Sequence, residues 1–264
     1  MNTFRFVPEG WNEEVENLSL QKIQKYKEEN KIVQGIVKSC DEKYNLHIQL
    51  GNEIEGIIPR CEVEDIGEGL PDERLCTGKV HKYVQFRIEN IENDNKVVLS
   101  RKSVQKEALQ YIKNTMQVGE QVTGIVKNIR PYGAFIEIGG GVVGLAHIED
   151  LSVARIKTPY ERLKIGQKVK CVVKSINEVT GKVNLSYKEL FGTWEENVKN
   201  FKEGMTVKGI VRDTEKNKNG IFIELTPNLV GMTEYTKELE YGQTVDVCIK
   251  KIVPEKKKVK LIIV

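Results

Sequence analysis

Four side chains in the middle of the chain are of types that bind unpaired nucleotides: Tyr132, Phe135, His147 and Lys182. An exposed aromatic ring offers a π-face on which a base can stack, at ~1–3 kcal/mol per base and with little dependence on base identity. Histidine can stack or donate a hydrogen bond, and lysine pairs with a phosphate. If these side chains share one face, they form a surface for single-stranded nucleic acid.

An isolated Phe135 on a strand would more often belong to a hydrophobic core than to a binding face. Tyr132, His147 and Lys182 accompany it in the frame of the family resemblance stated below, and that resemblance favours the binding face instead. Further candidates for phosphate contacts are the basic residues Lys127, Arg130, Lys168, Lys170 and Lys188.

The elements that would position these residues belong to a repeat. Three segments begin alike, at residues 34–38, 123–127 and 208–212, each with a Gly-Ile-Val core. Each continues with an alternating apolar run and a Gly-apolar step, and each closes on a Lys-rich strand. Self-similarity of this kind indicates three tandem copies of one small structure.

Alternation with a period of two, interrupted by Gly or Asn turns, predicts five short strands per copy. In the middle copy the strands are expected near 121–130, 133–139, 141–147, 167–176 and 182–187. A tight turn is expected at residues 139–141, and a loop with a helical turn at 148–165. Since a sandwich needs about seven strands, five strands instead predict a closed barrel of the oligonucleotide-binding type.

The sequence therefore predicts an all-β chain of three tandem five-stranded barrels joined by short α-helical linkers, with an N-terminal helix. An amphipathic stripe at residues 103–116 and another at 189–201 predict the linker helices. Residues 11–17 resemble residues 194–200, so a helix is also expected before the first barrel, continuing to about Glu29. The expected boundaries are 1–30 for the N-terminal helical segment, 31–102 for the first barrel, 103–116 for a linker, 117–188 for the second barrel, 189–202 for a linker, and 203–264 for a shortened third barrel.

Charge is distributed unevenly along the chain. The net charge is +3, but residues 1–116 hold 17 basic and 20 acidic residues, whereas residues 117–190 hold 11 and 7. The basic middle segment is what a phosphate-binding surface needs, although the excess is small. No segment is apolar enough for a membrane span, so we expect a soluble protein without membrane contact.

Cysteine and histidine usage argues against metal or redox chemistry. The five cysteines form no Cys-x-x-Cys pair, and the three histidines are scattered. We expect reduced thiols in the cytoplasm, no metal and no cofactor. No phosphate loop and no catalytic triad spacing occurs, and the repeats leave no room for a catalytic domain, so an enzyme is not expected.

The middle copy resembles the S1 RNA-binding domain. The resemblance is carried by the run from Gly124 to Gly139, by Gly144 to Ile148 and by Gly181 to Lys188. It implies an oligonucleotide-binding barrel that binds single-stranded RNA, and it places Glu178 at the acidic position that partners the basic residue. Three tandem copies resemble a shortened ribosomal protein S1.

The outer copies depart from this pattern. At the five site positions the first copy has Tyr44, His47, Pro59, Glu92 and Lys96, and the third has Asn219, Phe222, Glu234, Pro254 and Lys258. The third copy is also short between its third and fourth strands. We expect weak or no base stacking by either outer barrel.

The resulting hypothesis is a monomeric cytoplasmic protein that binds mRNA through its second barrel in translation. The resemblance implies that residues 1–116 dock on the small ribosomal subunit or a ribosomal protein. A regulator of transcript stability or transcription that acts without the ribosome is an open alternative. A protein-interaction scaffold is a second, and a nuclease with an appended barrel is a third, disfavoured for want of a catalytic domain.

Overall fold

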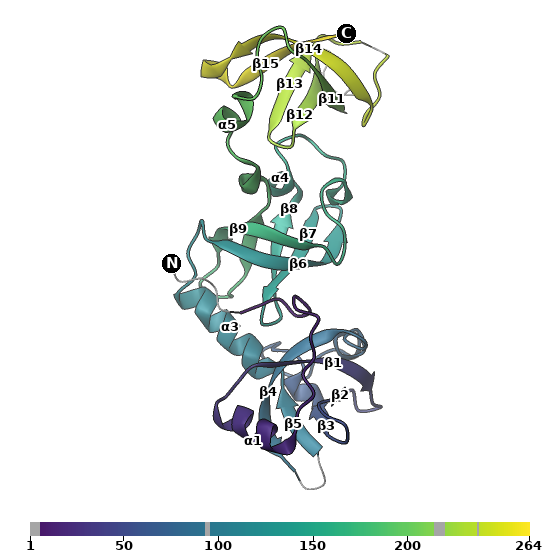
Figure 1. Ribbon diagram of the computed structural model, residues 1–264, viewed down its shortest axis with the longest axis vertical. Coiled ribbons are helices and arrows are strands. Elements are labelled where there is room, and N and C mark those ends of the chain that lie inside the picture. Colours follow the sequence, from purple (N-terminus) through teal and green to yellow (C-terminus); the bar gives the residue numbers. More distant parts are fainter. Residues whose placement is uncertain (1–5, 93–95, 214–219, 237) are drawn as a thin grey trace. The chain divides into compact units, whose positions relative to one another are not determined.

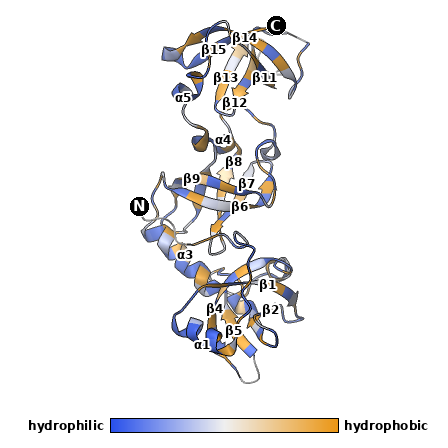
Figure 2. Cartoon of the chain, in the orientation of Figure 1, coloured by the Kyte–Doolittle hydropathy of each residue, from blue (hydrophilic) through white to orange (hydrophobic). Residues whose placement is uncertain are grey.

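The computed structural model describes residues 6–92, 96–213, 220–236 and 238–264, and it contains three closed five-stranded barrels (Figure 1). Alternate strand residues are buried, and Figure 2 shows hydrophobic and hydrophilic positions interspersed along the strands. This pattern arises because successive side chains of a strand point to opposite faces, so one set fills the barrel and the other faces outward. The predicted fold class is confirmed.

The first barrel is built from β1 (Val33–Cys40), β2 (Leu46–Gln49), β3 (Glu55–Ile58), β4 (Tyr83–Ile91) and β5 (Lys96–Ser100), in the spatial order β1-β2-β3-β5-β4. Its core holds Val37, Ile48, Phe86 and Leu99, all essentially without solvent contact. A 3-10 turn (Arg60–Glu62) and the short α2 (Glu73–Thr77) connect β3 to β4.

The first barrel is preceded by α1 (Leu20–Glu28), a largely hydrophilic helix in Figure 2 whose buried residues are Ile23 and Tyr26. The helix begins only at Leu20, where Ser19 accepts a hydrogen bond from the Lys22 amide and caps it. Just before it, the Leu18 amide donates to the Leu50 carbonyl. Residues 11–18 are not helical. The helix expected before the first barrel is therefore wrong for this segment.

The second barrel is built from β6 (Gln121–Arg130), β7 (Gly133–Gly139), β8 (Val142–His147), β9 (Lys168–Ile176) and β10 (Val183–Ser186), in the order β10-β8-β7-β6-β9. These bounds lie within one residue of those expected, and the predicted glycine turn lies between β7 and β8. The predicted loop contains α4 (Ile148–Leu151) and a 3-10 turn (Pro159–Glu161). The helix α3 (Lys102–Asn114) precedes this barrel.

The third barrel is built from β11 (Thr206–Asp213), β12 (Ile221–Thr226), β13 (Leu229–Thr233), β14 (Thr244–Val253) and β15 (Lys258–Ile263), in the order β11-β12-β13-β15-β14. The described residues between β13 and β14 contain no helix, in keeping with the short connection noted in the sequence. A 3-10 turn (Pro254–Lys256) joins the last two strands.

The helical linker expected at 189–201 consists of two short pieces rather than one helix. The segment is a 3-10 turn (Lys188–Phe191) and a short α5 (Trp194–Val198), separated by Gly192 at φ 76°. A left-handed glycine ends a helix, and Thr193 starts the next one with a capping box to Glu196. Trp194, Val198 and Phe201 pack against the core of the third barrel, as their spacing suggested.

The chain divides into two compact units that do not follow the repeats. The first is Met1–Ile125 with Ile136–Gly144 and Ile176–Val183, and the second is Val126–Phe135 with Leu145–Ser175 and Asn184–Val264. The strands of the second barrel are therefore divided between the two units. The expected domain boundaries stay predictions. Among the described residues, no helix is long and apolar enough to cross a membrane.

Candidate nucleic-acid interface

Tyr132 and Phe135 form an aromatic pair at the bend between β6 and β7. Their ring centroids are 6.0 Å apart and their planes are inclined by 83°, an edge-to-face arrangement. Tyr132 is exposed over 50% of its surface, and Phe135 is half-buried. The packing of one ring edge on the other holds both rings in place while leaving surface on which a base can stack.

Gly133 brings this pair against the end of β8. A Cβ at position 133 would lie 2.5 Å from the Ala146 carbonyl oxygen and 3.1 Å from the His147 Cα, so only glycine allows this approach. The Ile148 amide donates to the Tyr132 carbonyl at 2.9 Å. Tyr132, Phe135 and His147 are therefore gathered at one place on the second barrel, as the sequence predicted for a shared face.

The imidazole of His147 is oriented by its own helix turn. Its Nδ1 accepts a hydrogen bond from the Glu149 amide at 3.4 Å, and its side chain keeps 45% exposure. With Nδ1 as acceptor, the neutral ring carries its proton on Nε2. His147 can thus donate to a ligand from Nε2 or stack on a base.

The basic residues of this barrel differ in how they are held. Lys127 and Arg130 on β6 are exposed, and so are Lys168 and Lys170 on β9. Lys188 is half-buried, and two of its contacts are defined. Its Nζ donates to the Glu149 carbonyl at 2.8 Å and lies 3.6 Å from Asp150 Oδ1.

The Asp150 carboxylate partly neutralises the positive charge of Lys188. The carboxylate is 7% exposed and also accepts two hydrogen bonds from Lys174 Nζ, at 2.7 and 2.9 Å. Two lysines thus share one buried carboxylate, which leaves less of their charge for a phosphate. Nothing in the sequence distinguishes Lys188 from the other basic candidates.

Glu178 and Lys182 belong to the other compact unit. Both side chains are exposed on the turn between β9 and β10. Asn177 Oδ1 accepts from the Thr180 amide at 2.8 Å, and Gly181 has φ 70°, so the turn is well defined. Lys182 directly precedes β10, as expected.

Asn184 is a candidate that the sequence reasoning missed. It lies on β10 directly beside Leu145 of β8 in the parallel pairing, and it is exposed whereas its neighbours Val183 and Leu185 are buried. Its Nδ2 donates to the Ser175 hydroxyl at 2.9 Å. The buried-exposed alternation of β10 could have identified it, because it places position 184 on the outer face.

The corresponding face of the first barrel is occupied by its own side chains. The Arg60 guanidinium lies over the Tyr44 ring, 4.7 Å from its centroid. His47 lies between two carboxylates, 2.7 Å from Glu55 Oε1 and 3.3 Å from Asp41 Oδ2. A base would have to displace Arg60 from Tyr44 in order to stack there.

These contacts shift the ionisation of the first barrel's groups. Burial lowers the pKa of His47, but the hydrogen bonds to Glu55 and Asp41 outweigh it, and the pKa is raised. Burial raises the pKa of Asp41, but hydrogen bonds from Asn45 and His47 lower it to about 2. This corner of the first barrel is therefore anionic and repels phosphate.

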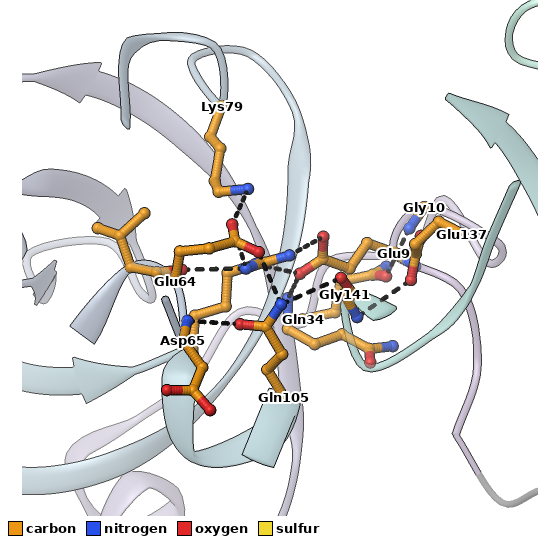
Figure 3. A network of polar contacts seen from close by, with 12 residues as sticks. Glu9, Gly10, Gln34, Glu64, Asp65, Lys79, Gln105, Glu137 and Gly141 are labelled. Atoms are coloured by element: carbon orange, nitrogen blue, oxygen red, sulfur yellow. Dashed lines mark hydrogen bonds and ion pairs between the residues drawn. The ribbon is translucent and has the colours of Figure 1, made fainter. Parts of the chain in front are cut away.

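A buried polar network within the first unit, shown in Figure 3, holds the segment around Glu9 in place. Both Glu9 carboxylate oxygens accept from Arg101, and the Glu9 amide donates to Glu137 Oε2 at 2.8 Å. Glu64 accepts from Arg101 at 2.9 Å. Burial raises the pKa of Glu9, but the charge and hydrogen bonds of Arg101 outweigh it and hold that pKa below its usual value.

The same network holds the glycine turn between β7 and β8. The Gly141 amide donates to Glu137 Oε1 at 3.1 Å, and a Cβ at Gly141 would lie 2.1 Å from an Arg101 nitrogen. A Cβ at Gly140 would lie 2.7 Å from the Ala108 Cβ on α3. The turn thus packs directly on the small Ala108 side chain of α3.

Comparison with known proteins gives a consistent result. A family model described as "S1 RNA binding domain" matches residues 26–102 and 115–188, which is more than half of the chain. "Small ribosomal subunit protein bS1" of Staphylococcus aureus (strain COL) is 33% identical over 195 residues, covering 67% of this chain and 49% of that protein. The protein of the same name from Rhizobium meliloti is 30% identical over 222 residues, covering 77% of this chain and 38% of that protein. The chain spans about half the length of the curated relatives it matches, or less.

Solved structures match over parts of the chain. The solution structure of GSP13 from Bacillus subtilis is 30% identical over 30% of this chain and 61% of that chain, with a TM-score of 0.29. A multidomain protein with nucleic acid binding domains from Streptococcus pneumoniae is 12% identical over 88% of this chain and 72% of that chain, with a TM-score of 0.26.

Proposed function

The chain belongs to the S1 RNA-binding domain family, and on that basis we propose that it binds single-stranded RNA through its second barrel. The observation that carries this proposal is the gathering of Tyr132, Phe135 and His147 around Gly133. Two aromatic rings and an imidazole at one exposed place suit splayed bases. Asn184 adds an amide that can hydrogen-bond a base edge.

Phosphate pairing supplies the second part of the proposed affinity. Lys127, Arg130, Lys168 and Lys170 are exposed on strands of the same barrel, and Lys182 directly precedes β10. We assign them to the RNA backbone and Glu178 to the partner of Lys182, as the family resemblance implies. Such contacts release counterions, so the affinity falls as salt is added.

The test is a titration of fluorescent single-stranded RNA at two salt concentrations with the full chain. Tyr132→Ala/Phe135→Ala is expected to lose about 2–6 kcal/mol of binding free energy, the cost of two stacked bases. Tyr160→Ala removes a tyrosine that is 54% exposed on the 3-10 turn of the same barrel and serves as the control. Unchanged binding by the double variant, with its fold intact by circular dichroism, would refute the proposal.

We further propose that the protein acts in translation with the small ribosomal subunit, since its relatives carry that name. Residues 1–116 are assigned to the docking, because the site positions of the first barrel are covered by Arg60 and made anionic by Asp41 and Glu55. Three exposed aliphatic side chains belong to the β3–β4 connection: Ile66, Leu70 and Leu75, exposed over 41%, 56% and 42% of their surfaces. Apolar surface of this kind suits a protein contact.

Co-sedimentation with small ribosomal subunits tests this docking. Leu70→Ser/Leu75→Ser is expected to reduce the pelleted fraction, whereas Val118→Ser/Val179→Ser, a pair of exposed valines of the second barrel, should not. If wild type binds RNA but does not pellet with subunits, the ribosome-independent regulator is the better account. If wild type binds no RNA even at low salt, a protein-interaction scaffold is favoured.

A further inference from the structure

The third barrel repeats the backbone arrangement that positions the aromatic pair of the second. A Cβ at Gly220 would lie 2.8 Å from the Thr233 carbonyl oxygen and 3.0 Å from Met232 Cγ. At Gly133 the equivalent Cβ would lie 2.5 Å from the Ala146 carbonyl oxygen. The close approach of the second strand to the third is thus the same, although the family model does not extend to this barrel.

A row of four side chains crosses the outer face of the third barrel at this level. Phe222 of β12 pairs with Met232 of β13, Met232 with Lys260 of β15, and Lys260 with Lys251 of β14. Phe222 and Met232 are half-buried, and the two lysines are exposed. An apolar strip therefore borders directly on two positive charges.

Lys251 and Lys260 lie directly opposite each other on β14 and β15. In the described part of the chain neither makes an ion pair, whereas Lys257 in the adjoining turn pairs with Glu195 at 2.7 Å. The segment from Thr244 to Ile263 contains six lysines against two carboxylates, Asp246 and Glu255. Like charges directly opposite in a sheet are destabilising, so a bound anion between them would be favoured.

One acidic residue of this barrel limits where an anion can run. Glu234 is exposed at the position that His147 has in the second barrel, directly after the end of β13. A polyanion would therefore run over β13, β15 and β14. Lys258, which begins β15 and is exposed, extends the basic surface in that direction.

We infer that the third barrel binds the phosphate backbone of the same single-stranded RNA through Lys251 and Lys260, with Phe222 and Met232 as an apolar floor beneath the strand. This inference rests on the proposed RNA binding by the second barrel. It adds a contact made mainly by charge, in a barrel whose site positions suit base stacking poorly. The third barrel thus raises affinity without adding sequence preference.

The test is a salt titration of a long fluorescent single-stranded RNA with the full chain carrying Lys251→Gln/Lys260→Gln. Removing two phosphate contacts should weaken binding about tenfold or more in 0.1 M salt and reduce the slope of log K against log salt by about 1.4. Lys199→Gln/Lys202→Gln removes two exposed lysines of the linker and is the control, expected to keep the wild-type slope.

Titrating Tyr132→Ala/Phe135→Ala in parallel separates the two proposals. If both pairs weaken binding and only the lysine pair lowers the slope, both stand. If the lysine pair matches its control while the aromatic pair weakens binding, the third-barrel inference is overturned and the proposed function stands. If only the lysine pair weakens binding, the inference stands and the aromatic site fails. If an acidic peptide binds the wild-type protein and RNA does not, the inference is also overturned.

Discussion

Both carboxylate oxygens of Glu9 accept hydrogen bonds from the Arg101 guanidinium, at 2.7 and 3.0 Å, although the residues are 92 positions apart. The side chains are 7% and 3% exposed. A two-point pair of this geometry is among the stronger polar contacts in proteins. It ties the segment before α1 to the strand that leads into α3.

Replacing Glu9 should therefore unfold the first unit more easily. Glu9→Ala leaves a buried guanidinium without its main partner, which costs about 3–5 kcal/mol of the free energy of unfolding. Glu14→Ala removes an exposed carboxylate of the same segment and should cost little. Urea unfolding followed by circular dichroism measures both, and equal midpoints for the two variants would contradict the role assigned to the pair.

The same pair predicts acid sensitivity. The folded-state pKa of Glu9 is lowered from 4.5. Its stabilising contribution is therefore complete above that value and is lost as pH falls from there through the lower folded-state pKa. Unfolding free energies measured in steps below pH 5 should fall more steeply for wild type than for Glu9→Ala.

Gly141→Ala tests the packing of the glycine turn. Alanine at φ 75° is strained by about 1–2 kcal/mol, and its Cβ would also meet Arg101 at 2.1 Å. Gly166→Ala has nearly the same φ, 83°, with nothing within 4 Å, so it isolates the backbone strain. The difference between the two variants should be about 1–3 kcal/mol, the cost of a displaced buried polar group. Equal thermal shifts would show that Arg101 moves aside freely.

His47 should titrate above its ordinary pKa of 6.5, because Glu55 and Asp41 hold the charged ring. Its contribution to stability is complete below pH 6.5 and is lost as pH rises through the folded-state pKa. An NMR titration of its ring protons measures this. Glu55→Gln should lower the pKa of His47, whereas Glu42→Gln, an exposed carboxylate of the same barrel, should leave it in place.

Lys182 and Lys188 should contribute unequally to RNA binding, although both were predicted from the sequence to contact phosphate. Lys182→Gln is expected to reduce the salt slope by about 0.7, the value for one phosphate contact. Lys188→Gln should reduce it less, because Asp150 and the Glu149 carbonyl already bind the ammonium group. A larger effect at Lys188 would show that it leaves these partners when RNA binds.

The strands of the barrels could be predicted from the sequence because their signal is local. Alternating apolar and polar residues, bounded by turn residues, mark each strand, and the three copies show the same order of strands. The gathering of Tyr132, Phe135 and His147 followed from the same frame, because Gly133 must lie against β8 wherever the barrel closes.

Features that depend on distant contacts were not predictable in the same way. Residues 11–17 share a pattern with residues 194–200, but Gln34 accepts from the Gly10 amide and donates to the Asn12 carbonyl, which holds that segment extended. The apolar stripe at residues 189–201 has helical spacing, but it did not reveal that Gly192 divides the segment. Glu9, Arg101 and Glu137 come from three separate parts of the chain, and no spacing rule links them.

The glycine turn between β7 and β8 has a consequence for modularity. Sequence repeats are often treated as cassettes that can be cut out and recombined. Here a cassette cut at residues 117–188 would take the turn away from Ala108 and would leave the Glu137 carboxylate without the Glu9 amide. The second repeat would then unfold less cooperatively alone than within its chain, and recombination between relatives would succeed best where α3 and the turn are exchanged together.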